Sequence, residues 1–400
     1  MKMPRKVLIL GFLMAIIAVQ IIPIDAAGSK TVTDMRGVKV SVPEDPQRVV
    51  AISRSLIDTT MYIFGEQDKL VGGSIPPSYQ KGGLYENYTY DGENHRVCTW
   101  ISYVLNPNCL NLTNVGGFGG PYGTVNVETI ASLEPDILIL EDFGNADEGV
   151  EKFLDSLEKL EVPVVVLKYP DCYKDINVST IYEEVRLLGE VFNRQDKAEE
   201  IVDHMDAQVQ LIRKRTADVD EDEKPRVLYF GVWSQAANSG GVGYAFGTDT
   251  IESVFLEDIV NAKNAYGHVG SGVQNGRIGT DIISTEQLLA LDPDIIILPT
   301  YAGYHSPSKI CESEGFEKVQ DLRSIKEKKV YALAATPVKS ERLEFPINLM
   351  IEAKAVYPDR FKDIDLENWI KDYFKKLYGV DDEKANELMN SMLLRYLEIV

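Results

Sequence analysis

The side chains best suited to chemistry in this sequence are arginines and aromatic residues that follow predicted strands. Aromatic rings supply apolar contact area at low entropic cost, and arginine makes planar bidentate bonds to carboxylates. Together such side chains could hold a flat, anionic chelate. The candidate ligand-binding residues are Arg54, Tyr122, Trp233, Tyr244, Arg277, Tyr301 and Tyr304, with His305 as a further contact.

No catalytic set emerges from the other polar residues. The sequence has four histidines and no HExxH, GxSxG or Walker pattern, and no cage of carboxylates and histidines for a bare metal ion. His204 falls within a helical pattern among acidic residues, and we expect it on the solvated surface. His268 lies in a loop, either exposed or against a ligand. The sequence thus predicts a binding protein rather than an enzyme.

The four cysteines form no CxxC pair, which disfavours a zinc or redox motif. In an oxidising compartment, an even number of cysteines favours disulfides. Cys98 and Cys109 flank one short loop, so we predict a disulfide between them. Cys172 and Cys311 are expected to remain thiols, because a bridge between them would lock the two halves of the molecule together.

Residues 1–27 have the layout of a secretory signal, with Lys2, Arg5 and Lys6 before an apolar run and small residues after it. We expect a cleaved leader, with a retained N-terminal anchor as the alternative. The mature chain is then a monomer in the periplasm or at the cell surface. The formal net charge of −21 argues against nucleic acid as a partner, because no basic excess is present to neutralise phosphates.

One segment occurs twice and indicates how the candidate residues are positioned. Residues 128–140 recur at 286–298, with seven of thirteen positions identical. An offset this long suits the duplication of a whole domain. Each copy predicts a short helix, a turn at a proline and a strand buried on both faces, because its Ile/Leu run is continuous. Similar runs predict further strands at 48–52, 162–167, 226–230 and 329–333. The pattern indicates an α/β protein with two Rossmann-like lobes and mainly parallel sheets.

The predicted lobes span residues 28–178 and 221–400, with a helical strut at 179–220 between them. Apolar residues recur at helical spacing from about 196 to 216, which predicts a helix about 30 Å long at 1.5 Å per residue. The strut lacks the Gly and Ser of a flexible linker, so it should be rigid. Residues 76–123 are rich in Gly, Asn and Tyr and are predicted to be an insertion on the surface of the first lobe.

Residues 31–43 and 47–53 resemble the opening of substrate-binding proteins that serve ABC importers of iron complexes and vitamin B12. The duplicated segment, the long inter-lobe helix and residues 357–365 and 373–380 are similar to the same family, the class III periplasmic binding proteins. The likeness covers nearly all of the mature chain except residues 76–115.

The resemblance implies a ligand held between the lobes and delivered to the membrane subunits of an ABC permease. The ligand would be a siderophore or haem complex of iron, with a corrinoid such as cobalamin as the alternative, and no resident cofactor. A carboxylate on each lobe would meet arginines of the permease; the best matches are Asp147, Glu148 and Asp249. A chelatase-like enzyme with the same lobe fold is the alternative of another class.

Overall fold

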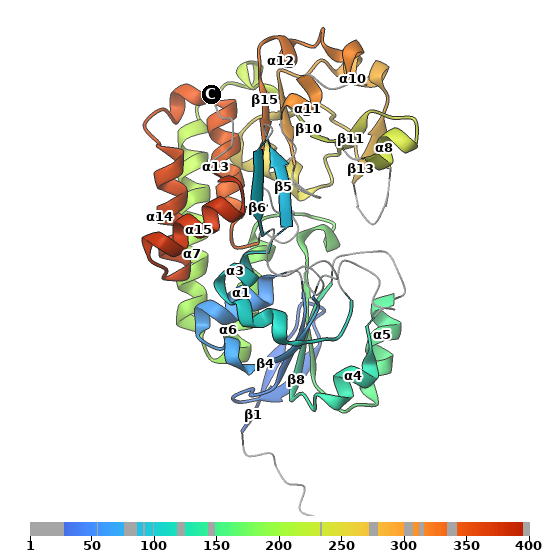
Figure 1. The fold of residues 1–400 in the computed structure, drawn as a ribbon, viewed down its shortest axis with the longest axis vertical. Helices are drawn as coiled ribbons and strands as arrows, with labels where there is room; N and C mark the ends of the chain where they lie inside the picture. The colour runs from blue at the N-terminus through green and yellow to red at the C-terminus, as the bar shows by residue number, and fades with distance from the viewer. Residues whose placement is uncertain are drawn as a thin grey trace, which may run out of the picture.

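The computed structural model describes residues 28–53, 55–75, 86–90, 93–98, 100–117, 125–142, 149–232, 234–271, 279–299, 307–311, 316–333 and 342–394. It confirms the predicted α/β class, with two mainly parallel sheets that lie one above the other along the molecule (Figure 1). Within these ranges, no helix combines the length and the apolar character needed to cross a membrane.

The sheet of the first lobe has five parallel strands in the order β7 (Thr113–Asn114), β4 (Leu70–Gly73), β3 (Val49–Ile52), β8 (Ile137–Asp142) and β9 (Val164–Lys168). Alternate residues of its central strands pack against α1 (Leu56–Phe64) and α6 (Ser179–Phe192) on one face. The others pack against α4 (Val127–Ser132) and α5 (Gly149–Glu158). From β3 the chain continues to β4 and β7 on one side, and from β8 it continues to β9 on the other. Where the strand order reverses in this way, between β3 and β8, a crevice is expected at the carboxyl ends of the two strands.

The sheet of the second lobe is mixed. Its order is β13 (Thr280–Ile283), β11 (Gly243–Phe246), β10 (Arg226–Gly231), β14 (Ile295–Leu298) and β15 (Val330–Ala332), and β12 (Lys263–Asn264) also pairs with β10. Strands β10, β14, β15 and β12 are parallel, whereas β11 pairs antiparallel with both β10 and β13. The nearby helices include α8 (Ser234–Asn238), α9 (Ile251–Val254), which continues into the π-helix η6 (Phe255–Val260), α10 (Thr285–Leu291), α11 (Ser308–Cys311) and α12 (Arg323–Lys326).

The duplicated segment has the same structural role in both lobes. It forms α4 and β8 in the first lobe and α10 and β14 in the second. The Asp136 carboxylate accepts a hydrogen bond from the backbone N–H of Arg48 at 3.1 Å, just before β3. The Asp294 carboxylate accepts one from the backbone N–H of Arg226 at 2.8 Å, at the start of β10. The Pro-Asp pair therefore fixes the amino end of the central strand beside it, which explains why both copies contain it.

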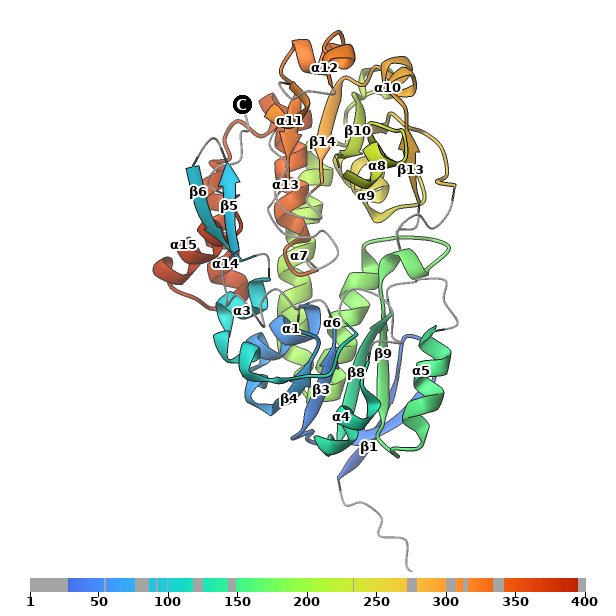
Figure 2. The same ribbon diagram turned by 45° about the vertical axis from the view of Figure 1, so that its right-hand side comes forward.

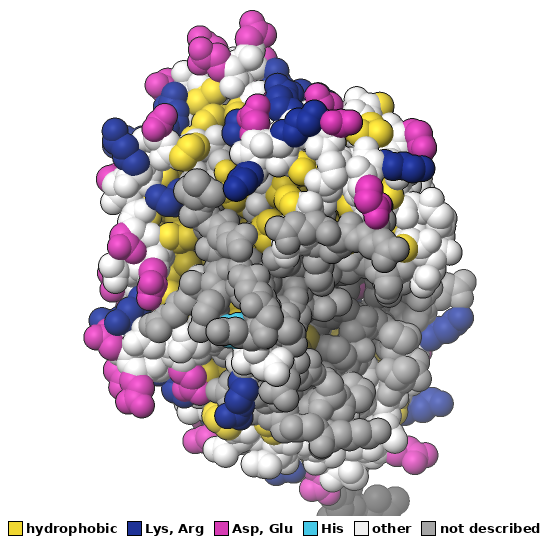
Figure 3. Space-filling view, turned by 45° about the horizontal axis from the view of Figure 1, so that its top comes forward, with side chains coloured by type: hydrophobic (Ala, Val, Ile, Leu, Met, Phe, Trp, Pro, Cys, Tyr) yellow, Lys and Arg dark blue, Asp and Glu magenta, His cyan; other side chains and the backbone are white. Residues whose placement is uncertain are grey.

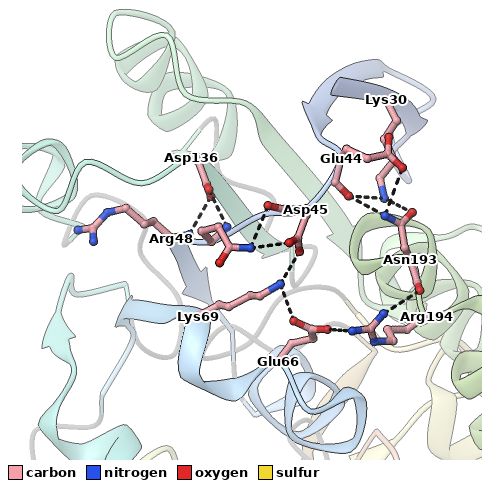
Figure 4. A network of polar contacts seen from close by, with 10 residues as sticks. Lys30, Glu44, Asp45, Arg48, Glu66, Lys69, Asp136, Asn193 and Arg194 are labelled. Atoms are coloured by element: carbon pink, nitrogen blue, oxygen red, sulfur yellow. Dashed lines mark hydrogen bonds and ion pairs between the residues drawn. The ribbon is translucent and has the colours of Figure 1, made fainter. Parts of the chain in front are cut away.

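A polar network closes the amino end of the first sheet (Figure 4). Lys69 pairs with Asp45 at 2.5 Å and with Glu66 at 2.6 Å, and Glu66 also pairs with Arg194, next to α6. These contacts attach the N-terminal hairpin of β1 (Ser29–Thr33) and β2 (Lys39–Pro43) and the turn after α6 to the sheet. With its amino end covered in this way, the sheet leaves its carboxyl end for a ligand.

The lobes are connected by α6 and then α7 (Gln195–Thr216), a continuous helix of 22 residues. The C-terminal helices α13 (Phe345–Val356), α14 (Leu366–Tyr378) and α15 (Asp382–Ser391) lie along the same side of the molecule, and α13 and α14 contact α7 (Figures 1 and 2). Apolar residues at the predicted helical spacing of α7 are buried against them, including Ile201, Met205 and Val209.

The prediction for His204 is wrong. Its side chain is 6% exposed and stacks on Tyr373 of α14, with ring centroids 4.5 Å apart. Burial, with a contribution from the charge of Lys376, lowers the pKa of His204 to about 4, so the ring is neutral at physiological pH. A polar residue among acids in a helical pattern predicted exposure, but α14, which comes about 160 residues later in the chain, covers this face.

The insertion contains a hairpin of β5 (Glu86–Tyr90) and β6 (Glu93–Val97), the helix α3 (Ile101–Leu105) and the 3-10 helix η2 (Pro107–Asn111). The five residues of α3 are buried, so this part is not a surface loop.

The prediction of a disulfide between Cys98 and Cys109 is wrong, because both residues are thiols. Two helical turns occupy most of the interval between them, and the Cys98 thiol donates instead to the Trp100 carbonyl at 3.2 Å. Cys172 and Cys311 are half-buried thiols, and the Cys172 thiol donates to the Asp142 carbonyl at 3.3 Å.

Acidic and basic side chains are interspersed on the described surface (Figure 3). The described acidic side chains on this face are therefore spread out rather than gathered into one acidic patch. Such a distribution favours solubility without marking one region of this face for a basic partner.

Candidate functional site

The two sheets meet through residues at the carboxyl ends of their strands. Tyr169 directly follows β9 of the first lobe, and Arg342 lies between β15 and α13 of the second. The guanidinium carbon of Arg342 lies 3.8 Å from the centroid of the Tyr169 ring. Ligands of open α/β sheets bind beyond the carboxyl ends of the strands. This contact therefore marks the floor of the cleft between the lobes.

Arg342 is held by two buried glutamates of the first lobe. Its Nε donates to Glu184 Oε2 of α6 at 3.1 Å, and its Nη2 pairs with Glu141 Oε1 of β8. The three side chains are at most 2% exposed. We call Glu141, Glu184 and Arg342 the interlobe triad, because it joins the two lobes by charge-assisted bonds in a region without water contact.

Burial shifts the pKa values of carboxyl groups in and beside the triad. Burial raises the pKa of Glu184 to about 8, against the opposing effect of Arg342. Burial and the charge of Glu141 raise the pKa of Asp58, on α1, to about 7. Although burial alone would lower it, the two glutamates hold the pKa of Arg342 above its ordinary value. Arg342 therefore stays positively charged, and its charge is already compensated by its glutamate partners.

Beside the triad lies a cavity of about 10 Å³, with walls from both lobes. A space of this size holds about one water molecule. The floor is therefore closed to any larger ligand. The cavity is lined by Tyr169, Pro170, Ile181, Ile251, Phe255, Arg342, Phe345 and Asn348.

Two serines border the crevice at the end of β3. Ser53 and Ser55 are 5% and 2% exposed, and among the described residues the hydroxyl of neither has a hydrogen-bond partner. Ser55 also has φ 92° and precedes α1 without capping it. A buried hydroxyl without a partner costs free energy, so both are suited to a polar group of a ligand.

Of the predicted ligand-binding residues, the structure describes Tyr244. It lies in strand β11 opposite Gly231, the last residue of β10, and is 2% exposed. The expectation of a loop at this position is therefore wrong, because β11 continues the sheet there. The ligand role of Tyr244 stays a prediction, as do those of the residues that lie outside the described ranges: Arg54, Tyr122, Trp233, Arg277, Tyr301, Tyr304 and His305.

The predicted docking residue Asp249 is half-buried just before α9. Its Oδ1 accepts a hydrogen bond from the backbone N–H of Gly270 at 2.7 Å, so it also fixes a neighbouring loop. His268 is exposed in that loop, with its ring edge-on to Tyr266. Asp147 and Glu148 lie outside the described residues. In the part of the chain that the structure describes, no three His, Cys, Asp or Glu side chains are grouped to hold a metal ion.

The sequence reasoning missed the residues of the cleft floor. Tyr169 directly follows β9 and Glu141 is the last residue but one of β8, so their position at the carboxyl ends of predicted strands was the available signal. Glu184 had no such signal, because a glutamate in an amphipathic helix ordinarily faces water. Arg342 could be placed near the cleft, but its pairing depends on two residues more than 150 positions away.

Comparisons with known proteins agree with this architecture. The molybdate-binding protein MolA of Haemophilus influenzae is 22% identical over 382 residues, which cover 90% of this chain and 94% of MolA. YvrC of Bacillus subtilis, an uncharacterized ABC transporter substrate-binding lipoprotein, is 22% identical over 334 residues, 83% of this chain and 87% of YvrC.

Solved structures share the fold. A periplasmic solute binding protein from Veillonella parvula superimposes with a TM-score of 0.64 at 21% identity, covering 91% of this chain and 97% of the other. MolA bound to molybdate gives a TM-score of 0.63 at 19% identity, with 88% and 98% covered.

A family model described as periplasmic binding protein matches residues 118–337, more than half of the chain. Members of this family bind substrates outside the cytoplasm for ABC transporters and are not enzymes, which removes the chelatase alternative. The chain therefore belongs to the periplasmic binding protein family, in the class that serves importers of iron complexes and vitamin B12.

Proposed function

We propose that this chain captures an iron complex between its lobes and delivers it to the permease of an ABC importer. The observation that carries the proposal is the closed floor of the cleft, where Arg342 is already paired with Glu141 and Glu184. A small bare anion would find this buried cation already compensated. A larger chelate, with its charge spread over its rim, would instead contact the loops of both lobes.

The predicted residues suit such a chelate. Arg54 and Arg277 would bond to carboxylate or hydroxamate oxygens, and the tyrosines and Trp233 would pack on its apolar faces. Ser53 and Ser55 would add two hydroxyls from the wall of the first lobe. A corrinoid presents apolar faces and an amide rim, and so competes for the same chemistry.

A titration of intrinsic fluorescence separates these ligands. We expect a ferric siderophore or haemin to quench Trp233 with saturation at one equivalent, and cobalamin and molybdate to have no effect. The variant Trp233→Phe, which keeps an aromatic ring, should lose most of the quenching and should still bind the same iron complex in calorimetry. Saturable binding of cobalamin or molybdate without a response to either iron complex would show that the ligand class is wrong.

We also propose that acids on each lobe dock to the permease, namely Asp147, Glu148 and Asp249. Charge reversal of all three residues should abolish uptake in cells and leave ligand affinity within about twofold. Because Asp249 also holds the backbone of Gly270, Asp249→Asn is the control that removes its charge with little change in shape. Unimpaired uptake by the triple reversal would reject the assignment.

A further inference from the structure

The insertion of the first lobe is anchored there at both ends. It leaves the sheet after β4 and returns to it in β7. Its helix α3 packs on α1, and Ile101, Tyr103 and Val104 are buried in the same cluster as the core residues of α1. This packing fixes the base of the β5–β6 hairpin to the first lobe.

The hairpin itself extends toward the second lobe (Figures 1 and 2). Its last residue, Val97, is 3% exposed and belongs to the hydrophobic core of the second lobe, together with Leu393, Ala332 and Ile310. The next residue, Cys98, belongs to a larger cluster that contains α1 and α3 and also reaches strands of the second lobe. Two consecutive residues thus pack into two different hydrophobic clusters, and Val97 attaches the insertion to the second lobe.

The C-terminal helices make the reverse connection, from the second lobe to the first. The backbone N–H of Cys98 donates to the Ser391 carbonyl at the end of α15 at 3.1 Å. Lys384, also on α15, donates from Nζ to the Val104 carbonyl of α3 at 3.3 Å. Helix α14 contacts α1 as well. A segment of each lobe is therefore bonded to the other, on the side of α7 where α14 and α15 lie (Figure 2).

We propose that the strands β5 and β6 and the helix α3 form an interlobe strap that, with α15, fixes the separation of the lobes. A single helix such as α7 can bend or twist about its axis. A second attachment away from that axis opposes both motions, and the interlobe triad adds a third at the cleft floor. The strap implies that the cleft keeps its width whether or not a ligand is bound.

Single-molecule energy transfer between the lobes tests the strap without any ligand. Dyes are placed at Ser132→Cys on α4 and Ala290→Cys on α10, equivalent exposed sites of the two repeat copies, with Cys172→Ser and Cys311→Ser to remove the two partly exposed thiols. The unmodified strap should give one narrow distance distribution. Val97→Asp, which places a charge between the two cores, should at least double its width.

The control is Val269→Asp, which adds the same charge to a valine that is 69% exposed. It should leave the distribution unchanged. Should Val97→Asp fail to fold, Val97→Ala removes most of the same contact without adding a charge, and circular dichroism confirms that the lobes are intact. A width equal to that of the unmodified protein in every folded Val97 variant would overturn the proposal.

Discussion

Replacement of Arg342 by methionine should lower the free energy of unfolding by about 3–5 kcal/mol, the typical cost of breaking a buried ion pair from one side. The substitution leaves Glu141 and Glu184 together in a site without water, where at most 2% of each side chain is exposed. It also removes the cation that stacks on Tyr169. Urea unfolding at pH 7, followed by circular dichroism, measures the loss.

Arg186→Met is the matched control. Arg186 makes two bonds to Glu199, at 2.8 and 3.0 Å, but the two side chains are 44% and 51% exposed. Exposed pairs contribute about 0–1 kcal/mol, so this change should have little effect. The triple change of Arg342→Met, Glu141→Leu and Glu184→Leu should recover most of the lost stability, because no charge is then left unpaired. Equal losses for the two single methionine variants would contradict the role of the triad.

The second large effect is a loss of stability as pH rises from 5 to 8. Burial raises to about 8 the pKa values of Glu344, which directly precedes α13, and of Glu352 on α13. In the unfolded chain both groups ionise near 4.5, so between these values the folded state holds more protons. Stability contributed by their protonated forms is therefore complete below pH 4.5 and decreases toward pH 8.

Single amide variants test this dependence. Glu344→Gln and Glu352→Gln keep the shape of the side chain and cannot ionise, so each should reduce the stability difference between pH 5 and pH 8 by about 1–3 kcal/mol. Glu128→Gln on α4, an exposed acid, should leave the difference unchanged. Urea midpoints at four pH values suffice. A stability difference between pH 5 and pH 8 that neither amide variant changes would show that these acids are not buried as described.

The sequence predicted the architecture because the information for it is local and repeated. The Ile/Leu runs at 137–140 and 295–298 predict buried strands without any information about the neighbouring strands. They lie in β8 and β14. The helical spacing at 196–216 likewise predicts α7 to within one residue at its start. Neither inference needs knowledge of a distant neighbour.

Burial that depends on distant partners could not be predicted. His204 is covered by Tyr373, and Arg342 is neutralised by Glu141 and Glu184, although nothing near any of them in sequence indicates a partner. The disulfide prediction failed for a related reason: proximity in sequence suggested a bridge between Cys98 and Cys109, whereas α3 and η2 fold the interval into helical turns. The long-range contacts thus decided the details of the cleft floor.

The most direct test is to purify the protein from its native host and to measure its visible spectrum, its metal content and its N-terminal sequence. The proposed function predicts one iron per chain, a charge-transfer or haem band that remains after gel filtration, and an N-terminus near residue 28, as expected after removal of the leader. Cobalt with a corrinoid spectrum, or molybdenum without a visible band, would contradict the capture of an iron complex.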